Sequence, residues 1–127
     1  MSTDPLLDER LDQVFLALSN RTRREILSIL RSGEITVNDL VNEGNFHRID
    51  DGKIKKITTQ AVVKHLRVLE KAGLISRSID KQTRPSKLEA EPLREAMDWI
   101  EEYREFWNQS FDKLDALMDE IQQKEQK

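Results

Sequence analysis

Apolar residues recur every three or four positions near the start of the chain, and this period predicts a run of short helices. The first predicted helix covers 5–18 and follows Asp4, a residue type that often caps helix N-termini. Asn20 caps a second helix that Gly33 ends, and Thr36 caps a short third helix. The chain therefore opens with three consecutive helices.

The segment 42–57 has no helical period, and an Asp-Asp-Gly sequence at 50–52 between two isoleucines indicates a hairpin there. A fourth, basic helix follows, capped by Thr58 and ended by Gly73 in a Schellman arrangement. A strand "LISRSI", a turn "DKQTRPS" and a short return strand "KLEA" then predict a second hairpin.

From Pro92 onward the apolar positions again follow a helical period, which predicts a long helix interrupted only by the charge of Arg104. The stripe is wide because several aromatic residues flank it. An apolar face of this width on a terminal helix needs a partner surface. Its members are Met97, Trp99, Ile100, Tyr103, Phe106, Trp107, Phe111, Leu114, Met118 and Ile121.

Composition narrows the class of protein. The 127 residues suffice for one modest domain, and the absence of cysteine excludes disulfides, thiolate metal sites and cysteine nucleophiles. No stretch approaches the ~20 apolar residues that cross a bilayer, so we expect a cytoplasmic protein without membrane contact.

Charge is distributed unevenly along the chain. Residues 53–87 carry 10 Lys and Arg against 2 Asp and Glu, a net charge of +8. The segments before and after them carry −4 and −7, so that the whole chain has a net charge of −3. A basic block between acidic flanks indicates one surface that meets a polyanion.

The order of elements, and four sequence pieces within it, resemble the ArsR-type transcriptional regulators. The pieces are "LSNRTRREILSIL", "TVNDL", "AVVKHLRVLEKAGLI" and the second hairpin. The resemblance implies a mainly α fold with a small β-hairpin wing, a winged helix-turn-helix with N- and C-terminal dimerisation helices. It implies a single domain over 1–127, with dimerisation helices at 5–18 and 92–122 and a DNA-binding core and wing over 20–88.

Two features depart from the family. Metal-sensing members carry cysteines at the positions matching 35–40, or His and carboxylates on the C-terminal helix; this chain has neither cysteine nor a histidine there. We therefore expect no metal and no cofactor. The family joins its third and fourth helices by a short turn, so the longer connection at 42–57 is an atypical insert.

In such a fold the fourth helix enters the major groove and the wing contacts the DNA backbone. We expect double-stranded DNA as a partner. The alternative is that the same residues cap the helix or form an ordinary solvated basic face. The expected DNA-binding residues are Thr58, Thr59, Gln60, Val63, Lys64 and Arg67 of the helix, and Arg77, Lys81 and Arg84 of the wing.

Other basic residues allow more than one interpretation. Arg21, Arg23 and Arg24 open the second helix, where they contact a phosphate or pair with an acid on the first or last helix. His65 is expected to be half-buried, with a hydrogen bond to phosphate as one possibility, and not a metal ligand. The lysines of the 42–57 insert add phosphate contacts or lie on a disordered loop.

The aromatic residues of the terminal helices favour a homodimer interface over a small-molecule pocket. The sequence thus predicts a homodimeric repressor on a near-palindromic operator, with no catalytic constellation and an unknown effector. Two alternatives are a protein-interaction module without DNA binding and a regulator with an effector pocket between the terminal helices. The expected interface residues are Leu7, Leu11, Phe15, Trp99, Tyr103, Phe106, Trp107 and Phe111.

Overall fold

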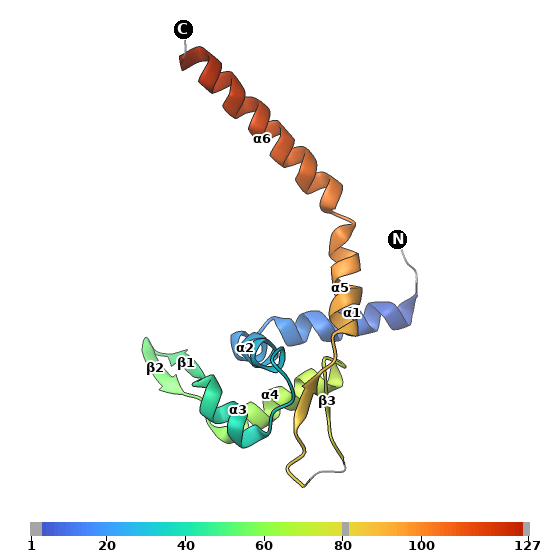
Figure 1. Cartoon of the computed structure of the whole chain (residues 1–127), viewed down its shortest axis with the longest axis vertical. Coiled ribbons are helices and arrows are strands. Elements are labelled where there is room, and N and C mark those ends of the chain that lie inside the picture. The colour runs from blue at the N-terminus through green and yellow to red at the C-terminus, as the bar shows by residue number, and fades with distance from the viewer. Residues whose placement is uncertain (1–3, 80–81, 126–127) are drawn as a thin grey trace. The chain divides into compact units, whose positions relative to one another are not determined.

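The computed structural model describes residues 4–79 and 82–125, and it divides into two compact units, Met1–Ala96 and Met97–Lys127. The described residues are mainly helical with small antiparallel hairpins, which confirms the predicted α+β class (Figure 1). The elements are α1 (Pro5–Leu18), α2 (Arg21–Leu30), α3 (Val37–Gly44), β1 (His47–Asp50), β2 (Lys53–Lys56), α4 (Thr59–Lys71), β3 (Ile75–Arg77), β4 (Ser86–Leu88), α5 (Glu91–Glu101) and α6 (Arg104–Glu125).

The first four helices begin where local sequence predicts. The side chains of Asp4, Asn20, Thr36 and Thr58 each accept a backbone N–H of the following turn, at donor–acceptor distances between 2.9 and 3.2 Å. Each bond satisfies one of the N–H groups that a helix start leaves without an intrahelical partner. The start of each of these four helices is therefore determined by its N-cap residue.

The end of α4 is equally local. Gly73 has φ +75°, and its N–H donates to the Glu70 carbonyl at 2.9 Å. The N–H of Leu74 donates to the Leu69 carbonyl at 3.0 Å, which completes the predicted Schellman motif. Leu74 is thereby fully buried, and β3 begins at the next residue.

The core of the first unit gathers one face of each of α1, α2 and α4 with single residues from neighbouring segments. Leu40 is the buried contribution of α3, and α4 packs against both α2 and α3. α3 and α4 thus pack together as in a helix-turn-helix, although the 42–57 insert lengthens the connection between them. The most deeply buried side chains are Val14, Ile26, Leu40, Val62, Leu66, Leu69, Leu74 and Ser86.

The wing formed by β3 and β4 is tied to the helices through Ile35, the residue before the cap of α3. Ile35 and Ser86 exchange two backbone hydrogen bonds, at 3.0 and 2.8 Å. Within the wing Ile75 pairs with Leu88 and Arg77 with Ser86. The bridge fixes the base of the wing against the α2–α3 connection.

The hairpin predicted inside 42–57 is confirmed. β1 pairs with β2 in antiparallel register, with Ile49 opposite Ile54. The two loop residues Asp51 and Gly52 have φ +49° and +76°, as a two-residue hairpin loop of type I′ requires. Asn45, at φ +46°, ends α3 and turns the chain into β1.

The long helix predicted from Pro92 onward is divided into α5 and α6. Glu102 and Tyr103 form the turn between them, and their N–H groups bond three residues back, to Trp99 and Ile100. A continuous helix would place Asp98 near Glu102 and Glu101 near Glu105 at i,i+4 spacing, and like charges at that spacing are unfavourable.

Among the described residues, no helix combines the length and apolar character that crossing a bilayer requires.

Candidate nucleic-acid interface

The helix α4 has one face in the core and one face free. Val62, Leu66 and Leu69 are 0% exposed and hold the helix against the rest of the first unit. The residues on the other face are Thr59, Gln60, Lys64 and Arg67, all exposed, with Val63 half-buried beside them. The buried apolar face thus fixes the orientation of α4, and polar and basic side chains occupy its exposed surface.

Thr58 has a structural role at the start of this face. Its hydroxyl oxygen accepts the N–H of Ala61 at 3.1 Å and caps α4. The residue itself is exposed, so capping and contact with a ligand do not exclude each other. Thr59 lies one position on and is not the N-cap.

The expected wing residues have different surroundings. Arg84 is exposed and adopts φ +44° in the turn, whereas Arg77 is half-buried. The Nε of Arg77 is enclosed and has no hydrogen-bond partner among the described residues. Lys81 lies outside the residues that the structure describes. Lys87 is exposed on β4.

The three arginines of α2 separate into distinct roles. Arg21 pairs with Glu25 on its own helix, at 3.1 Å between Nε and Oε1. Arg24 donates from Nη1 to the Leu18 carbonyl at 2.7 Å. One expectation for this group was an ion pair with an acid on the first or last helix. Arg21 instead pairs with an acid of its own helix, and Arg24 bonds a backbone carbonyl of α1.

Arg23 is the residue that sequence reasoning did not single out from its neighbours. Its Nε donates to the Ala17 carbonyl at 2.8 Å and its Nη2 to the Leu16 carbonyl at 2.9 Å. Both carbonyls lie in the last turn of α1, where a positive charge is favourable. No local signal distinguishes Arg23 from Arg21 or Arg24, because the bonds depend on the angle between α1 and α2.

His65 completes this cluster on α4. Its Nδ1 lies 3.2 Å from Nη1 of Arg23. Because a guanidinium has only donors, Nδ1 is the acceptor, and the neutral ring carries its proton on Nε2. Burial, and secondarily the charge of Arg23, lower the pKa of His65 below its ordinary value of 6.5. The half-buried position was predicted, whereas its partner is an arginine of the same chain.

A hollow of about 220 Å³ opens where α2, β1, β2 and α4 meet. Its lining is mixed, with apolar surface from Ile57 and Ala61, and its polar part includes His65 and the cap residues Asn20 and Thr58. Arg48 of β1 and Lys56 of β2 also line it. The first turn of α4 is thus bordered by cations of the β1–β2 hairpin.

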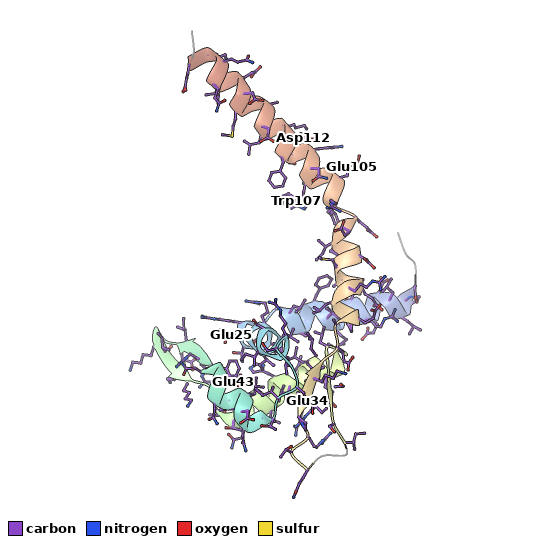
Figure 2. All side chains as sticks on the ribbon, viewed as in Figure 1. Glu25, Glu34, Glu43, Glu105, Trp107 and Asp112 are labelled. Carbon is purple, nitrogen blue, oxygen red and sulfur yellow. The ribbon has the colours of Figure 1, made fainter. Side chains whose placement is uncertain are left out.

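The expected dimer residues fall into two groups. In α1, Leu11 is only 8% exposed in the core of the first unit, and Leu7 and Phe15 are half-buried. The second unit has no buried residue in α6, and its aromatic side chains stand exposed, Trp107 among them (Figure 2). Within this unit Trp99 contacts Tyr103, and Phe106 contacts Trp107, with ring centroids 5.3 and 5.6 Å apart.

The packed α2–α3–α4 core, with a hairpin directly after α4, defines a winged helix-turn-helix protein. Across 4–79 and 82–125, no cluster of three or more His, Cys, Asp or Glu side chains is placed to hold a metal ion.

Comparison with known proteins gives the family. No protein-family model matches the chain. The uncharacterized HTH-type transcriptional regulator YuzN of Bacillus subtilis (strain 168) is 37% identical over 92 residues, 71% of this chain and 95% of YuzN. The transcriptional repressor SdpR of the same organism is 28% identical over 90 residues, 71% of this chain and 88% of SdpR.

Solved structures agree. A crystal structure of an ArsR family transcriptional regulator matches with a TM-score of 0.65 and 29% identity, covering 85% of this chain and 97% of that one. A possible transcriptional regulator for arsenical resistance matches with a TM-score of 0.55, also at 29% identity, covering 79% and 90%. The chain belongs to the ArsR family of helix-turn-helix transcriptional regulators, and the relatives it matches are transcriptional regulators by name.

Proposed function

We propose that the protein is a homodimeric repressor that binds a near-palindromic DNA operator through α4. The observation that carries this proposal is the division of α4 into a face with zero exposure and a polar, basic face opposite to it. A helix with such a face fits the major groove, where base edges present distinct patterns of donors and acceptors.

The residues of α4 suit different tasks on DNA. Gln60, in the first turn, can form two hydrogen bonds to adenine, and Thr59 beside it offers a hydroxyl and a methyl group. Val63 suits a thymine methyl, and Lys64 suits guanine or a phosphate. Arg67, further along the helix, is assigned to the phosphate backbone.

We assign backbone contact to the wing as well, through Arg77, Lys81 and Arg84. Arg84 is the favourable case among the described residues because it is exposed at the turn. An arginine at a wing tip suits a phosphate or a narrow minor groove. Such contacts position the protein on DNA without selecting a sequence.

The second unit supports assembly with a second copy. Trp107, Phe111, Leu114, Met118 and Ile121 are spaced by four and three residues in alternation, the a/d pattern of a coiled coil. They are between 49 and 60% exposed. A second α6 in the same register would cover this seam, with Trp99, Tyr103 and Phe106 beside it. In α1, Leu7 and Phe15 offer more surface to a partner than Leu11 does.

The dimer sets the form of the operator. Two copies of α4 related by a twofold axis present the same face to two half-sites about ten base pairs apart. A near-palindromic sequence follows from that symmetry. Repression is proposed because SdpR is a transcriptional repressor, and a bound dimer blocks access to a promoter.

Selection of bound sequences from a random pool of DNA tests the proposal. We expect a palindromic consensus, and recovery of no enriched sequence would refute DNA recognition. Titration against one duplex at two salt concentrations separates this function from that of a protein-interaction module, because only DNA binding weakens steeply with salt. A thermal-shift screen of small molecules tests for an effector.

A further inference from the structure

We infer that the β1–β2 hairpin is a second wing, which contacts the phosphate backbone beside the N-terminal end of α4. The inference rests on the DNA binding proposed above and assigns part of it to residues 47–56. The helix α4 is then bordered by a hairpin at each end, β1–β2 before it and β3–β4 after it (Figure 1).

The base of this hairpin is firmly anchored. Phe46 and Ile57 are buried, at 2 and 8% exposure, and the N–H of Ile57 donates to the Phe46 carbonyl at 3.0 Å. Gly44 leaves the space that the Phe46 ring fills, because a Cβ added there would overlap the ring. Apart from the half-buried Asp50, the residues of the strands beyond this base are exposed, so the hairpin projects from a fixed point.

One face of the hairpin is cationic. Side chains alternate across a strand, so Arg48 and Asp50 share a face with their cross-strand partners Lys55 and Lys53. Arg48 pairs with Asp50 at 3.0 Å, whereas neither lysine is paired with an acid among the described residues. Two free ammonium groups on one exposed face are a site for phosphate oxygens.

The opposite face differs in character. Ile49 and Ile54, paired across the strands, are 67 and 73% exposed there. His47 shares this face and lines a hollow with Glu25 of α2 and Glu43 of α3, both labelled in Figure 2. Two acidic residues thus border the base of the isoleucine face, together with Arg21, which pairs with Glu25.

The cationic face lies on the side of α4. Arg48, which belongs to it, lines the 220 Å³ hollow together with Thr58 and His65 at the start of that helix. Lys56, the last residue of β2, borders the same hollow from the base of the hairpin, although it shares the opposite face with its cross-strand partner His47. A phosphate strand that passes the first turn of α4 would therefore meet the cationic face.

The dimensions fit this placement. A helix of 13 residues is about 20 Å long, while the major groove is about 12 Å wide. If α4 lies across the groove, its two ends come close to the two walls, where the phosphates lie. Strands that rise about 3.3 Å per residue carry Lys53 about 13 Å beyond Ile57, far enough to follow one wall.

The double variant Lys53→Gln/Lys55→Gln tests the inference. Each phosphate contact contributes about 0.9 to the slope of log K against log salt. We expect the slope to fall by about 1 to 2, and affinity at 0.1 M salt to fall about 8- to 60-fold if affinity at 1 M is unchanged. The weakening should be the same for different sequences, because phosphate contacts carry no base preference.

The matched control is Lys113→Gln/Lys124→Gln, which removes the same charge from exposed positions of α6. A second variant replaces residues 47–56 by Asn-Gly, which suits a two-residue turn between Phe46 and Ile57. We expect it to keep the helical circular dichroism spectrum and base preference of the wild type and to lose at least as much slope as the double variant.

The outcomes are distinguishable. If the wild type binds a selected consensus and both hairpin variants retain its slope, the inference is overturned while the proposed function stands. A changed base preference in the double variant would also overturn backbone contact. If the wild type binds no DNA, the proposed function fails and the inference fails with it.

Discussion

Replacing Arg23 by methionine removes three hydrogen bonds that join α1, α2 and α4 while it keeps a long aliphatic side chain. Two of the bonds reach carbonyls in the last turn of α1, at 2.8 and 2.9 Å, and the third reaches His65 at 3.2 Å. We expect this single change to destabilise the first unit far more than the same change at Arg21 or Arg24.

The magnitude follows from the number and exposure of the bonds. A hydrogen bond from a charged group contributes about 1.5–3 kcal/mol. The bond to the Leu16 carbonyl is exposed and counts for less, whereas those to Ala17 and His65 are partly buried. We therefore expect Arg23→Met to lower the free energy of unfolding by about 2–4 kcal/mol.

The neighbouring arginines provide matched controls on the same helix. Arg24→Met loses one exposed bond, to the Leu18 carbonyl, and should cost about 0.5–1 kcal/mol. Arg21→Met loses an exposed i,i+4 ion pair, which contributes about 0.3–0.5 kcal/mol. The three variants should thus rank Arg23, Arg24 and Arg21 in decreasing cost.

Urea unfolding followed by circular dichroism measures this ranking, at one fixed protein concentration because dimerisation adds to apparent stability. With an m-value of about 2 kcal/mol/M, the midpoint for Arg23→Met should fall by about 1–2 M. A cost for Arg23→Met no larger than that for Arg24→Met would show that the bonds of Arg23 to α1 and α4 do not stabilise the fold.

Four further changes follow from the structure. Gln60→Ala should relax the base preference at one position of each half-site with a loss of about 1–3 kcal/mol in binding, measured by titration against single-base variants of the selected operator. The pKa of His65 is lowered in the folded chain, so the unfolded chain binds a proton at this residue more readily. Stability should therefore fall as the pH drops below about 6.5. His65→Gln should remove this part of the pH dependence, measured by urea midpoints between about pH 5 and 7.5. Gly73→Ala should cost about 1–2 kcal/mol because its φ of +75° is left-handed, whereas the added Cβ would meet the Pro92 ring at an ordinary 3.5 Å. Phe111→Asp should shift the protein towards monomer in sedimentation velocity, because it places a charge in the proposed α6 seam.

Three of these changes have a control variant, and each of the four has a contrary result. Gln122→Ala removes an exposed glutamine of α6 and should leave the base preference unchanged. A wild-type base preference in Gln60→Ala would contradict the assignment of Gln60 to base contact. His47→Gln is the control because it removes the other histidine of the chain, and an unaltered pH profile in His65→Gln would contradict the lowered pKa of His65. Gln109→Asp places the same charge outside the seam. If Phe111→Asp forms dimers as well as Gln109→Asp does, the proposed α6 seam is excluded. Wild-type stability in Gly73→Ala would contradict the backbone argument.

Features that depend on neighbouring residues could be predicted from the sequence. Caps, glycine stops and turn chemistry act over three or four positions, so Thr36, Thr58 and Gly73 mark their helix ends in the structure as the sequence predicted. The same holds for the Asp51-Gly52 loop. The periodic burial of α4 was also legible, because a stripe of apolar residues can face only the core.

Which basic residues are free and which bond to other helices depends on the tertiary structure. Arg21, Arg23 and Arg24 are indistinguishable in sequence, and only the packing of α1 against α2 brings helix-end carbonyls within reach of two of them. The same packing brings Arg23 to His65, 42 positions away. These bonds join groups remote in the chain, so no local pattern of residues encodes them.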